Sequence, residues 1–276
     1  MPEAREVGKG LCTVSKDTDV VIVSAARTAI GTFGGALRDV RAYELAAHVM
    51  REVLKRADNL DPNVVSDVIV GDCLQNVDEA NTARVAALAA GIPHQVTAFT
   101  VQRNCASSMQ ALISGTQQIL CQDSDVVLVA GVESMSSAPY YLDKARWGMR
   151  LRNHEVIDSV WEALHSGSRL LGESMIMGIT AENLAEKDDI SREDQDQVAL
   201  ESNNKAEAAI KAGLFAEEIV PIEVSGDKGE SVVFLQDEHP RFGLSIGDLA
   251  KLKPVFKKNG TVTAGNSSGI NDGAAA

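Results

Sequence analysis

The chain has 276 residues, 45% of them hydrophobic and 24% charged, and a formal net charge of −13. This length can bury a large core and predicts one or two domains. The negative charge argues against a binder of nucleic acid or anionic membranes, whose contacts need a basic surface. No apolar run approaches the ~18 residues of a membrane span, and the polar leader 1–18 lacks the apolar core of a signal peptide. We therefore expect a cytoplasmic protein.

The first half of the chain alternates continuous apolar runs with segments of helical spacing. The runs predict buried strands at 19–26, 67–75, 98–102 and 125–134, and the spacing predicts helices at 42–57, 81–91 and 106–121. Gly91 and Pro93 end the second of these helices. Such alternation is typical of an α/β sandwich with a largely parallel sheet.

The composition becomes more polar after residue 139. A helix is predicted at 190–215, with Ser191 as its N-cap and Gly213 as its stop, and strand character returns only at 261–265. A polar stretch of this length is too long for a loop. We therefore expect four parts: the leader, a core domain at 19–139, an inserted domain at 140–258, and a return strand with the start of a helix at 259–276.

Four cysteines are present, and none forms a CxxC pair, so the sequence gives no signal for a metal site. Cys105 lies between a predicted strand and a predicted helix, whereas Cys12, Cys73 and Cys121 have no suggestive setting. The segment 104–122 contains no charged residue, which predicts a helix buried on most sides. Unpaired N–H groups at its first turn would favour a Cys105 thiolate and could bind an oxyanion. A small buried core residue is the alternative.

The segment around Cys105, "VQRNCASSMQA", resembles the nucleophile segment of thiolases, which condense acyl-CoA units or cleave 3-ketoacyl-CoA. Five further segments of the chain also resemble thiolases: "VVIVSAARTAIGTFGGAL", "AGVESMSSAPY", "MGITAENLAEK", "DEHPRFG" and "TVTAGNSSGINDGAAA". The resemblance covers nearly the whole chain. It implies a layered α/β/α fold with a mixed five-stranded sheet, built from 19–139 and 259–276, and an inserted, mainly helical lid domain.

The resemblance also implies roles for single residues. Cys105 would be the catalytic nucleophile that accepts the acyl group. Coenzyme A and acyl-CoA would bind as substrates, with no permanently bound cofactor and no metal. The positions that match the coenzyme pocket of the family are Met177, Arg241, Phe256, Ala264 and Ser268. Outside the family context, Arg241 would belong to a surface ion pair, Phe256 would be a core aromatic, and Ser268 would be a turn serine. The lysines at 251–258 would be a solvated face.

The chain departs from the family pattern in two ways. Ile176 replaces a histidine found in many short-chain thiolases, so the preferred acyl chain is open. The "NEAFA", "GHPxG" and "CxGGG" motifs of the C-terminal half do not occur, and the five histidines lie in no matching context, so we expect them to be structural or exposed. The predicted partners are therefore a C-terminal thiolase half or complementary chain, and a second copy in a dimer or tetramer.

Three other functions were weighed. A β-ketoacyl synthase shares the fold but lacks the long insertion at 140–258. A nicotinamide-binding protein is disfavoured because "GTFGG" is not a G-x-G-x-x-G motif. A non-catalytic coenzyme A-binding or assembly subunit remains open.

Overall fold

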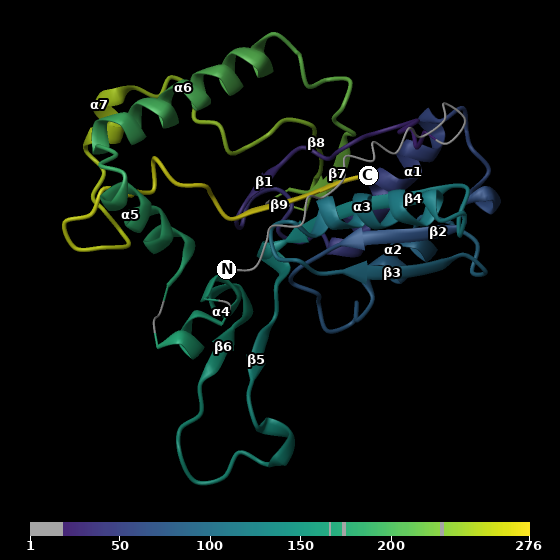
Figure 1. Cartoon of the computed structure of the whole chain (residues 1–276), viewed down its shortest axis with the longest axis horizontal. Coiled ribbons are helices and arrows are strands. Elements are labelled where there is room, and N and C mark those ends of the chain that lie inside the picture. Colours follow the sequence, from purple (N-terminus) through teal and green to yellow (C-terminus); the bar gives the residue numbers. More distant parts are fainter. Residues whose placement is uncertain (1–18, 166, 173–174, 227–228) are drawn as a thin grey trace, which may run out of the picture.

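A computed structural model describes residues 19–165, 167–172, 175–226 and 229–276. An α/β core, a lid of helices joined by long loops, and a hairpin that extends away from both are visible in Figure 1. The predicted leader lies outside the described residues. The helices of the core are α1 (Ala42–Arg56), α2 (Thr82–Ala89) and α3 (Ser107–Leu120), with a 3-10 turn η2 (Pro62–Val64) after α1.

The core contains one mixed sheet of five strands, in the order β1-β9-β4-β2-β3. The strands β2 (Asp67–Gly71), β3 (Thr97–Val101) and β4 (Val127–Ser134) are parallel, with β2 between the other two. Strand β9 (Asn271–Ala275) runs antiparallel to β4 and to the short β1 (Gly31–Thr32). The expected mixed five-stranded sheet is confirmed.

Helices cover both faces of this sheet, which confirms the three-layered arrangement. On one face, the apolar side chains of α1 and α2 pack with Val68, Val70 and Leu128 into a continuous buried core. On the other face, α3 contacts β2 and β4 through a stripe of small buried residues, Ser107, Ala111 and Gly115. Small residues four apart place one side of a helix close to a sheet.

The prediction of a buried strand at 19–26 is wrong. Val21, Ile22 and Val23 are each at least 70% exposed and belong to no strand. Pairing begins only at Ala26, which exchanges two backbone hydrogen bonds with Ala276. Because the two segments run antiparallel, residues before Ala26 extend past Ala276, where no other strand of the described chain receives them.

The expectations for the last segment of the chain are also wrong. Residues 261–265 form no strand; they are turns held by side chains, with Asn266 Oδ1 accepting from the N–H of Thr263 at 2.7 Å. Residues 271–275, expected as the start of a helix, form β9 instead. Backbone hydrogen bonds to β4 and to residues 26–28 decide this conformation, which the Gly- and Ala-rich sequence leaves undetermined.

A 3-10 turn, η3 (Met135–Ser137), follows β4 and leads into the lid, the insertion expected at 140–258. Its longest helix begins after Ser191, whose Oγ accepts from the N–H of Asp194, and ends before Gly213, which has φ +69°. The predicted N-cap at Ser191 and the predicted stop at Gly213 are therefore both confirmed. The helices of the lid are α4 (Ser159–His165), η5 (Ser168–Leu171), α5 (Met177–Lys187), α6 (Arg192–Lys211) and α7 (Ile246–Ala250). The strands β7 (Ile222–Ser225) and β8 (Ser231–Phe234) pair with each other, and Ile222, Val224 and Phe234 pack into the buried core cluster, so this part of the insertion expected at 140–258 packs with the core instead.

Carboxylates join the lid to other parts of the chain. Asp237 accepts from the guanidinium of Arg27 and from the N–H of Ile30, and Glu238 accepts from the N–H of Thr32. Within the lid, the buried Glu182 of α5 accepts from the N–H groups of residues 261 and 262. These contacts hold the loops that lead back to the core.

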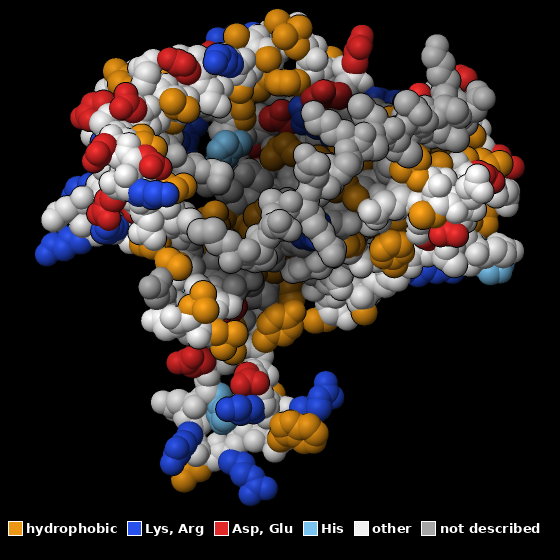
Figure 2. All heavy atoms as spheres, viewed as in Figure 1, with side chains coloured by type: hydrophobic (Ala, Val, Ile, Leu, Met, Phe, Trp, Pro, Cys, Tyr) orange, Lys and Arg blue, Asp and Glu red, His pale blue; other side chains and the backbone are white. Residues whose placement is uncertain are grey.

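The extended hairpin pairs β5 (Tyr140–Leu142) with β6 (Val156–Asp158), with a 3-10 turn η4 (Ala145–Trp147) in its loop. Figure 2 shows Lys and Arg side chains gathered at its tip. Trp147 and Leu151 are also exposed there. Within the described residues, no helix combines the length and the apolar character needed to cross a bilayer.

Candidate active site

Cys105 lies in a hollow of about 360 Å³ at the C-terminal ends of β2 and β4. The loop after β2 supplies Asp72 and Cys73, strand β4 supplies Gly131 and Glu133, and β9 supplies residues 271–275. Ligands of open α/β sheets bind outside the carboxyl ends of the strands. The position of Cys105 is therefore the one expected for a reactive residue.

Two glycines bring the start of α3 against the sheet. A Cβ atom on Gly71 would lie 2.4 Å from backbone atoms of Ser107 and Ser108, and one on Gly131 would lie 2.4 Å from the Cβ of Ser108. No side chain fits at such distances without displacing the helix. The two glycines thus fix how deeply the helix, and Cys105 before it, lies in the hollow.

Cys105 precedes α3 by two residues and is exposed. Asn104 adopts a left-handed conformation, φ +48°, which Asn tolerates better than most residues. The N–H groups of Ala106 and Ser107 donate to the carbonyls of Arg103 and Asn104, so neither is free for the thiolate. Of the first-turn N–H groups that were expected to be unpaired, those of Ala106 and Ser107 therefore have partners.

The prediction that α3 is buried on most sides is wrong for the chain as described. Met109, Ile113 and Leu120 are at least 40% exposed on the side away from the sheet. The absence of charge on this helix thus marks a face that the described chain does not cover. Gln110 contacts Arg103 and Ser114 there, while Gln117 is exposed.

Carboxyl groups, which no sequence motif had singled out, dominate the electrostatics of the hollow. Burial, and next the charge of Asp72, raise the pKa of Glu133 to about 7. Burial also raises the pKa of Asp72 and that of Asp272, and it raises the pKa of the Cys73 thiol to about 11. Among the described residues that line the hollow, none is Lys, Arg or His.

Arg241 and Ser268, two of the residues predicted to bind coenzyme A, line a second hollow of about 360 Å³. It lies between α6 and the loops at 239–244 and 265–268. Asn203 of α6 grips the backbone of Arg241, donating to its carbonyl at 2.7 Å and accepting from its N–H at 2.9 Å. His239, expected to be structural or exposed, also lines this hollow, and its ring lies over Gly269. Asn203 and His239 carried no signal in the sequence.

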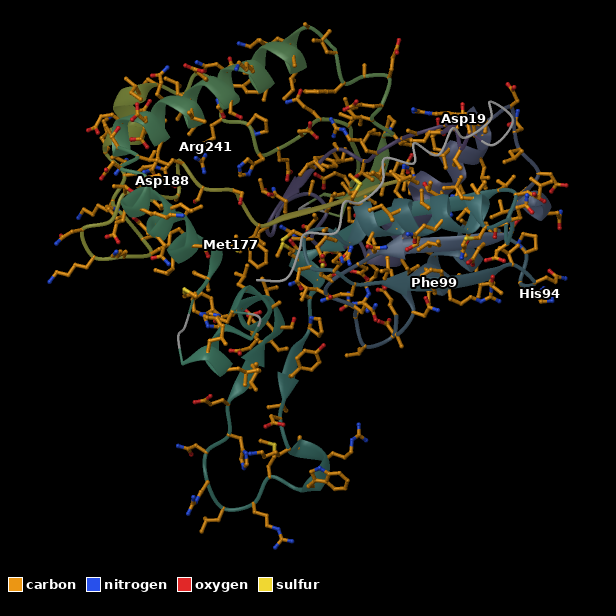
Figure 3. The ribbon with its side chains drawn as sticks, viewed as in Figure 1. Asp19, His94, Phe99, Met177, Asp188 and Arg241 are labelled. Atoms are coloured by element: carbon orange, nitrogen blue, oxygen red, sulfur yellow. The ribbon has the colours of Figure 1, made fainter. Side chains whose placement is uncertain are left out.

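The other three predicted residues lie nearby in the lid but do not line that hollow. Met177 begins α5 and is 66% exposed, and Ala264 is exposed on the return loop. Phe256 packs over Gly178, where an added Cβ would lie 2.3 Å from the ring. Figure 3 shows Met177 and Arg241 on the lid side of the molecule, far from Phe99 and His94 of the core.

The remaining candidate side chains have structural partners or are exposed. His48 interacts with the carbonyl of Pro221 at 3.0 Å, and His165 with that of Trp161 at 2.8 Å. Burial lowers the pKa of His48. Among the lysines at 251–258, Lys251 pairs with Asp248 and Lys257 with Glu186. In the described part of the chain, no three His, Cys, Asp or Glu side chains are placed to hold a metal ion.

Comparison with known proteins agrees with this arrangement. The family model described as "Thiolase, N-terminal domain" matches residues 20–276. The chain belongs to the thiolase family. Among curated thiolase relatives, it is 48% identical over 260 residues to the beta-ketothiolase BktB of Cupriavidus necator, covering 94% of this chain and 64% of that protein. It is 46% identical over 263 residues to an acetyl-CoA acetyltransferase of Pseudomonas aeruginosa, covering 94% of this chain and 65% of that one.

Solved thiolase structures share the fold. The Bacillus anthracis acetyl-CoA acetyltransferase superposes with a TM-score of 0.87 at 51% identity, over 92% of this chain and 64% of that chain. The human mitochondrial 3-ketoacyl-CoA thiolase in complex with CoA gives a TM-score of 0.84 at 41% identity, over 92% of this chain and 62% of that chain. The chain thus spans a little under two thirds of the length of these thiolases.

Proposed function

We propose that the protein acts as an acyl-CoA C-acyltransferase, joining two acyl-CoA units into a 3-ketoacyl-CoA or cleaving that product with coenzyme A. The observation that carries the proposal is the position of Cys105, at the open end of the parallel strands and directly before a helix that two glycines hold against the sheet. Membership of the thiolase family supports it.

Cys105 is the nucleophile in this proposal. Its thiolate attacks the thioester carbonyl of acyl-CoA, the bond from that carbon to the coenzyme sulfur breaks, and coenzyme A leaves as a thiolate. In the second half-reaction, the α-carbon of another acyl-CoA loses a proton and attacks the acyl-cysteine, which releases the Cys105 thiolate. Splitting the transfer in this way is the general advantage of a covalent intermediate.

The lid holds the coenzyme. Arg241 can pair with a phosphate, and Ser268 can hydrogen-bond an amide of the pantetheine arm. Phe256 and Met177 offer apolar surface near the start of α5, and Ala264 leaves room on the return loop. Support comes from the shared hollow of Arg241 and Ser268 and from the similar human thiolase that was solved with CoA.

The proton transfers of this chemistry need a base for the thiol and an acid–base group for the α-carbon. No histidine or lysine is found among the described residues that line the Cys105 hollow, whose ionisable groups are carboxyls and thiols. We propose that a C-terminal thiolase half supplies them, and that the protein functions in the cytoplasm as a dimer or tetramer. The exposed apolar side chains of α3 and of the edge strand β3 are the surfaces available for these contacts.

The proposal is tested by measuring which cysteine sulfur receives the acyl group. The protein is incubated with acetyl-CoA, with and without a complementing C-terminal thiolase half, and each cysteine is examined by mass spectrometry. We expect an acetyl group on Cys105, and ketoacyl-CoA formation only in the complemented sample. Cys105→Ala should abolish both, while Cys121→Ala, a matched exposed cysteine, should retain them.

Coenzyme A binding measured by calorimetry separates a transferase from a non-catalytic binding subunit. A transferase loses acetylation, but not coenzyme binding, when Cys105 is replaced by Ala. A protein that binds coenzyme A normally and never acetylates Cys105, even when complemented, would be a binding subunit, and the proposal would be overturned.

A further inference from the structure

Two carboxyl groups meet beside Cys105 without a cation to balance them. Asp72 is 1% exposed; its Oδ2 accepts from the hydroxyl of Thr82, while its buried Oδ1 receives no hydrogen bond within the described residues. Glu133 lines the same hollow as Asp72, and the charge of Asp72 acts on its carboxyl group. Its Oε1 accepts from the N–H of Leu74 at 3.1 Å and its Oε2 from that of Cys73 at 3.3 Å.

A buried oxygen without a donor is destabilising, and two adjacent carboxylates repel each other. One proton removes both penalties, because a protonated carboxyl group donates to its ionised neighbour. We propose that Asp72 and Glu133 share one proton at neutral pH, donated by Glu133 to Asp72 Oδ1, and that this pair positions the loop that carries Cys105.

A chain of contacts connects the pair to the nucleophile. Glu133 binds the backbone of Cys73, and the Cys73 thiol donates to the carbonyl of Asn104 at 3.0 Å. Ser107 Oγ donates to the same carbonyl at 2.6 Å and accepts from the N–H of Arg103 at 2.8 Å. Residues 72–74 and 103–107 therefore hold each other, with Cys105 inside the second loop. Asp72 and Glu133 act through these loops and are positioning residues.

The surroundings favour keeping the proton. From β9, Asp272 adds a third carboxyl group to the hollow and is held by the N–H and hydroxyl of Ser136. Glu79, near Asp72, is itself paired with Arg41 at 3.2 Å. Helix α3 carries no charged residue toward the pair. With the thiols of Cys73 and Cys105, these carboxyl groups are the ionisable groups that face the pair in the described part of the chain, and none of them is a cation that could balance a second full negative charge.

Infrared spectroscopy tests the shared proton directly, because a protonated carboxyl group and a carboxylate have different carbonyl stretches. Wild-type protein is compared with Glu133→Gln, Asp72→Asn and, as a matched control in the same hollow, Asp272→Asn. We expect a protonated-carboxyl band that is lost with a midpoint near pH ~7, is missing in Glu133→Gln, and persists in Asp272→Asn. Asp72→Asn should shift the midpoint down, because the neighbouring charge is removed. Absence of the band in wild-type protein at pH ~6, or its persistence in Glu133→Gln, would overturn the shared proton.

The positioning role is read from the rate at which iodoacetamide labels Cys105 across this pH range. Labelling rises with the thiolate fraction of Cys105 in every variant. Because Gln can donate to Asp72 and accept from a backbone N–H, Glu133→Gln should show this rise without the additional inflection that follows loss of the shared proton in wild-type protein. Glu133→Ala leaves Asp72 Oδ1 and two N–H groups unpaired, and its labelling rate should change by on the order of tenfold at every pH. Wild-type labelling in Glu133→Ala would overturn this role. If Glu133→Ala does not fold, the Glu133→Gln profile decides alone. Neither readout uses acyl-CoA, so the result is independent of the proposed function.

Discussion

Replacing Gly71 by Ala is expected to move the nucleophile rather than simply fill space. The added Cβ would lie 2.4 Å from the carbonyl carbon of Ser107 and from the nitrogen of Ser108, whereas ordinary contacts begin at 3.4 Å. Both obstructing atoms belong to the backbone, so no rotamer change relieves the overlap. The start of α3 must therefore withdraw from the sheet by about 1 Å, the difference between 3.4 and 2.4 Å.

Two consequences follow from this displacement. Overpacking of a tightly packed layer costs about 1–3 kcal/mol, which should lower the free energy of unfolding by that amount. A shift of 1 Å in a reacting group can reduce rates about 100-fold. We therefore expect acyl transfer to Cys105 to fall by about 100-fold even under conditions in which the variant is fully folded.

Urea unfolding followed by circular dichroism gives the first quantity, and mass-spectrometric acetylation of Cys105 in the complemented enzyme gives the second. Gly247→Ala is the matched control. Gly247 lies in α7, where an added Cβ meets only the Ser245 hydroxyl at 3.8 Å, so this variant should be neutral or stabilised by up to ~1 kcal/mol. If Gly71→Ala keeps both the wild-type urea midpoint and the wild-type acetylation rate, the close-packing argument is refuted.

Three further outcomes are expected. Glu182 is 2% exposed, and burial alone would raise its pKa, but hydrogen bonds from residues 261–262 outweigh burial and lower the pKa. The ionised Glu182 therefore stabilises the folded state above pH ~4.5, and this stabilisation is lost as pH falls through the folded-state pKa. Glu182→Gln should cost about 1–3 kcal/mol in urea unfolding at neutral pH, and an unchanged midpoint would contradict this. Asn203→Ala should weaken coenzyme A binding in calorimetry by freeing the backbone of Arg241, without changing the iodoacetamide labelling of Cys105. If the variant binds coenzyme A with wild-type affinity, Asn203 has no role in the coenzyme site. Because the pKa of Glu133 is raised to about 7, the contribution of its protonated form to the free energy of unfolding is fully present below pH ~4.5 and is lost as pH rises through 7, by up to ~3 kcal/mol. The urea midpoint of wild-type protein should therefore decline over this range, and that of Glu133→Gln should not.

Local signals in the sequence were sufficient for much of the core. The helical spacing of 42–57, the small-residue segment 81–91 and the apolar runs at 67–75 and 125–134 each correspond to an element of the structure, with ends that differ by a few residues. These signals work because the burial along each segment follows the period of its own secondary structure, one buried face in the helix at 42–56 and alternate burial in β4. Strand β2 is buried at all five positions, so its apolar run has no exception.

Segments whose partners are distant were not predictable in this way. Residues 19–26 are as apolar as β2, yet 21–23 remain exposed because the described chain has no strand beside them. Residues 271–275 have almost no strand character, yet β4 on one side and β1 on the other complete a ladder around them. A strand is stabilised by hydrogen bonds to its neighbours, so composition alone can neither create nor guarantee one.

Part of the candidate site could likewise be predicted from the sequence, and part could not. The sequence by itself determined that one cysteine lies between a strand and an uncharged helix, and its motifs indicated the thiolase family. Only the tertiary structure decided that Asp72, from the loop after β2, meets Glu133 of β4 beside that cysteine, and that Asn203 grips the backbone of Arg241. The physical reason is that pKa values and hydrogen bonds depend on burial and on neighbours within a few ångströms. Residues 61 positions apart become such neighbours only when parallel strands place their ends side by side.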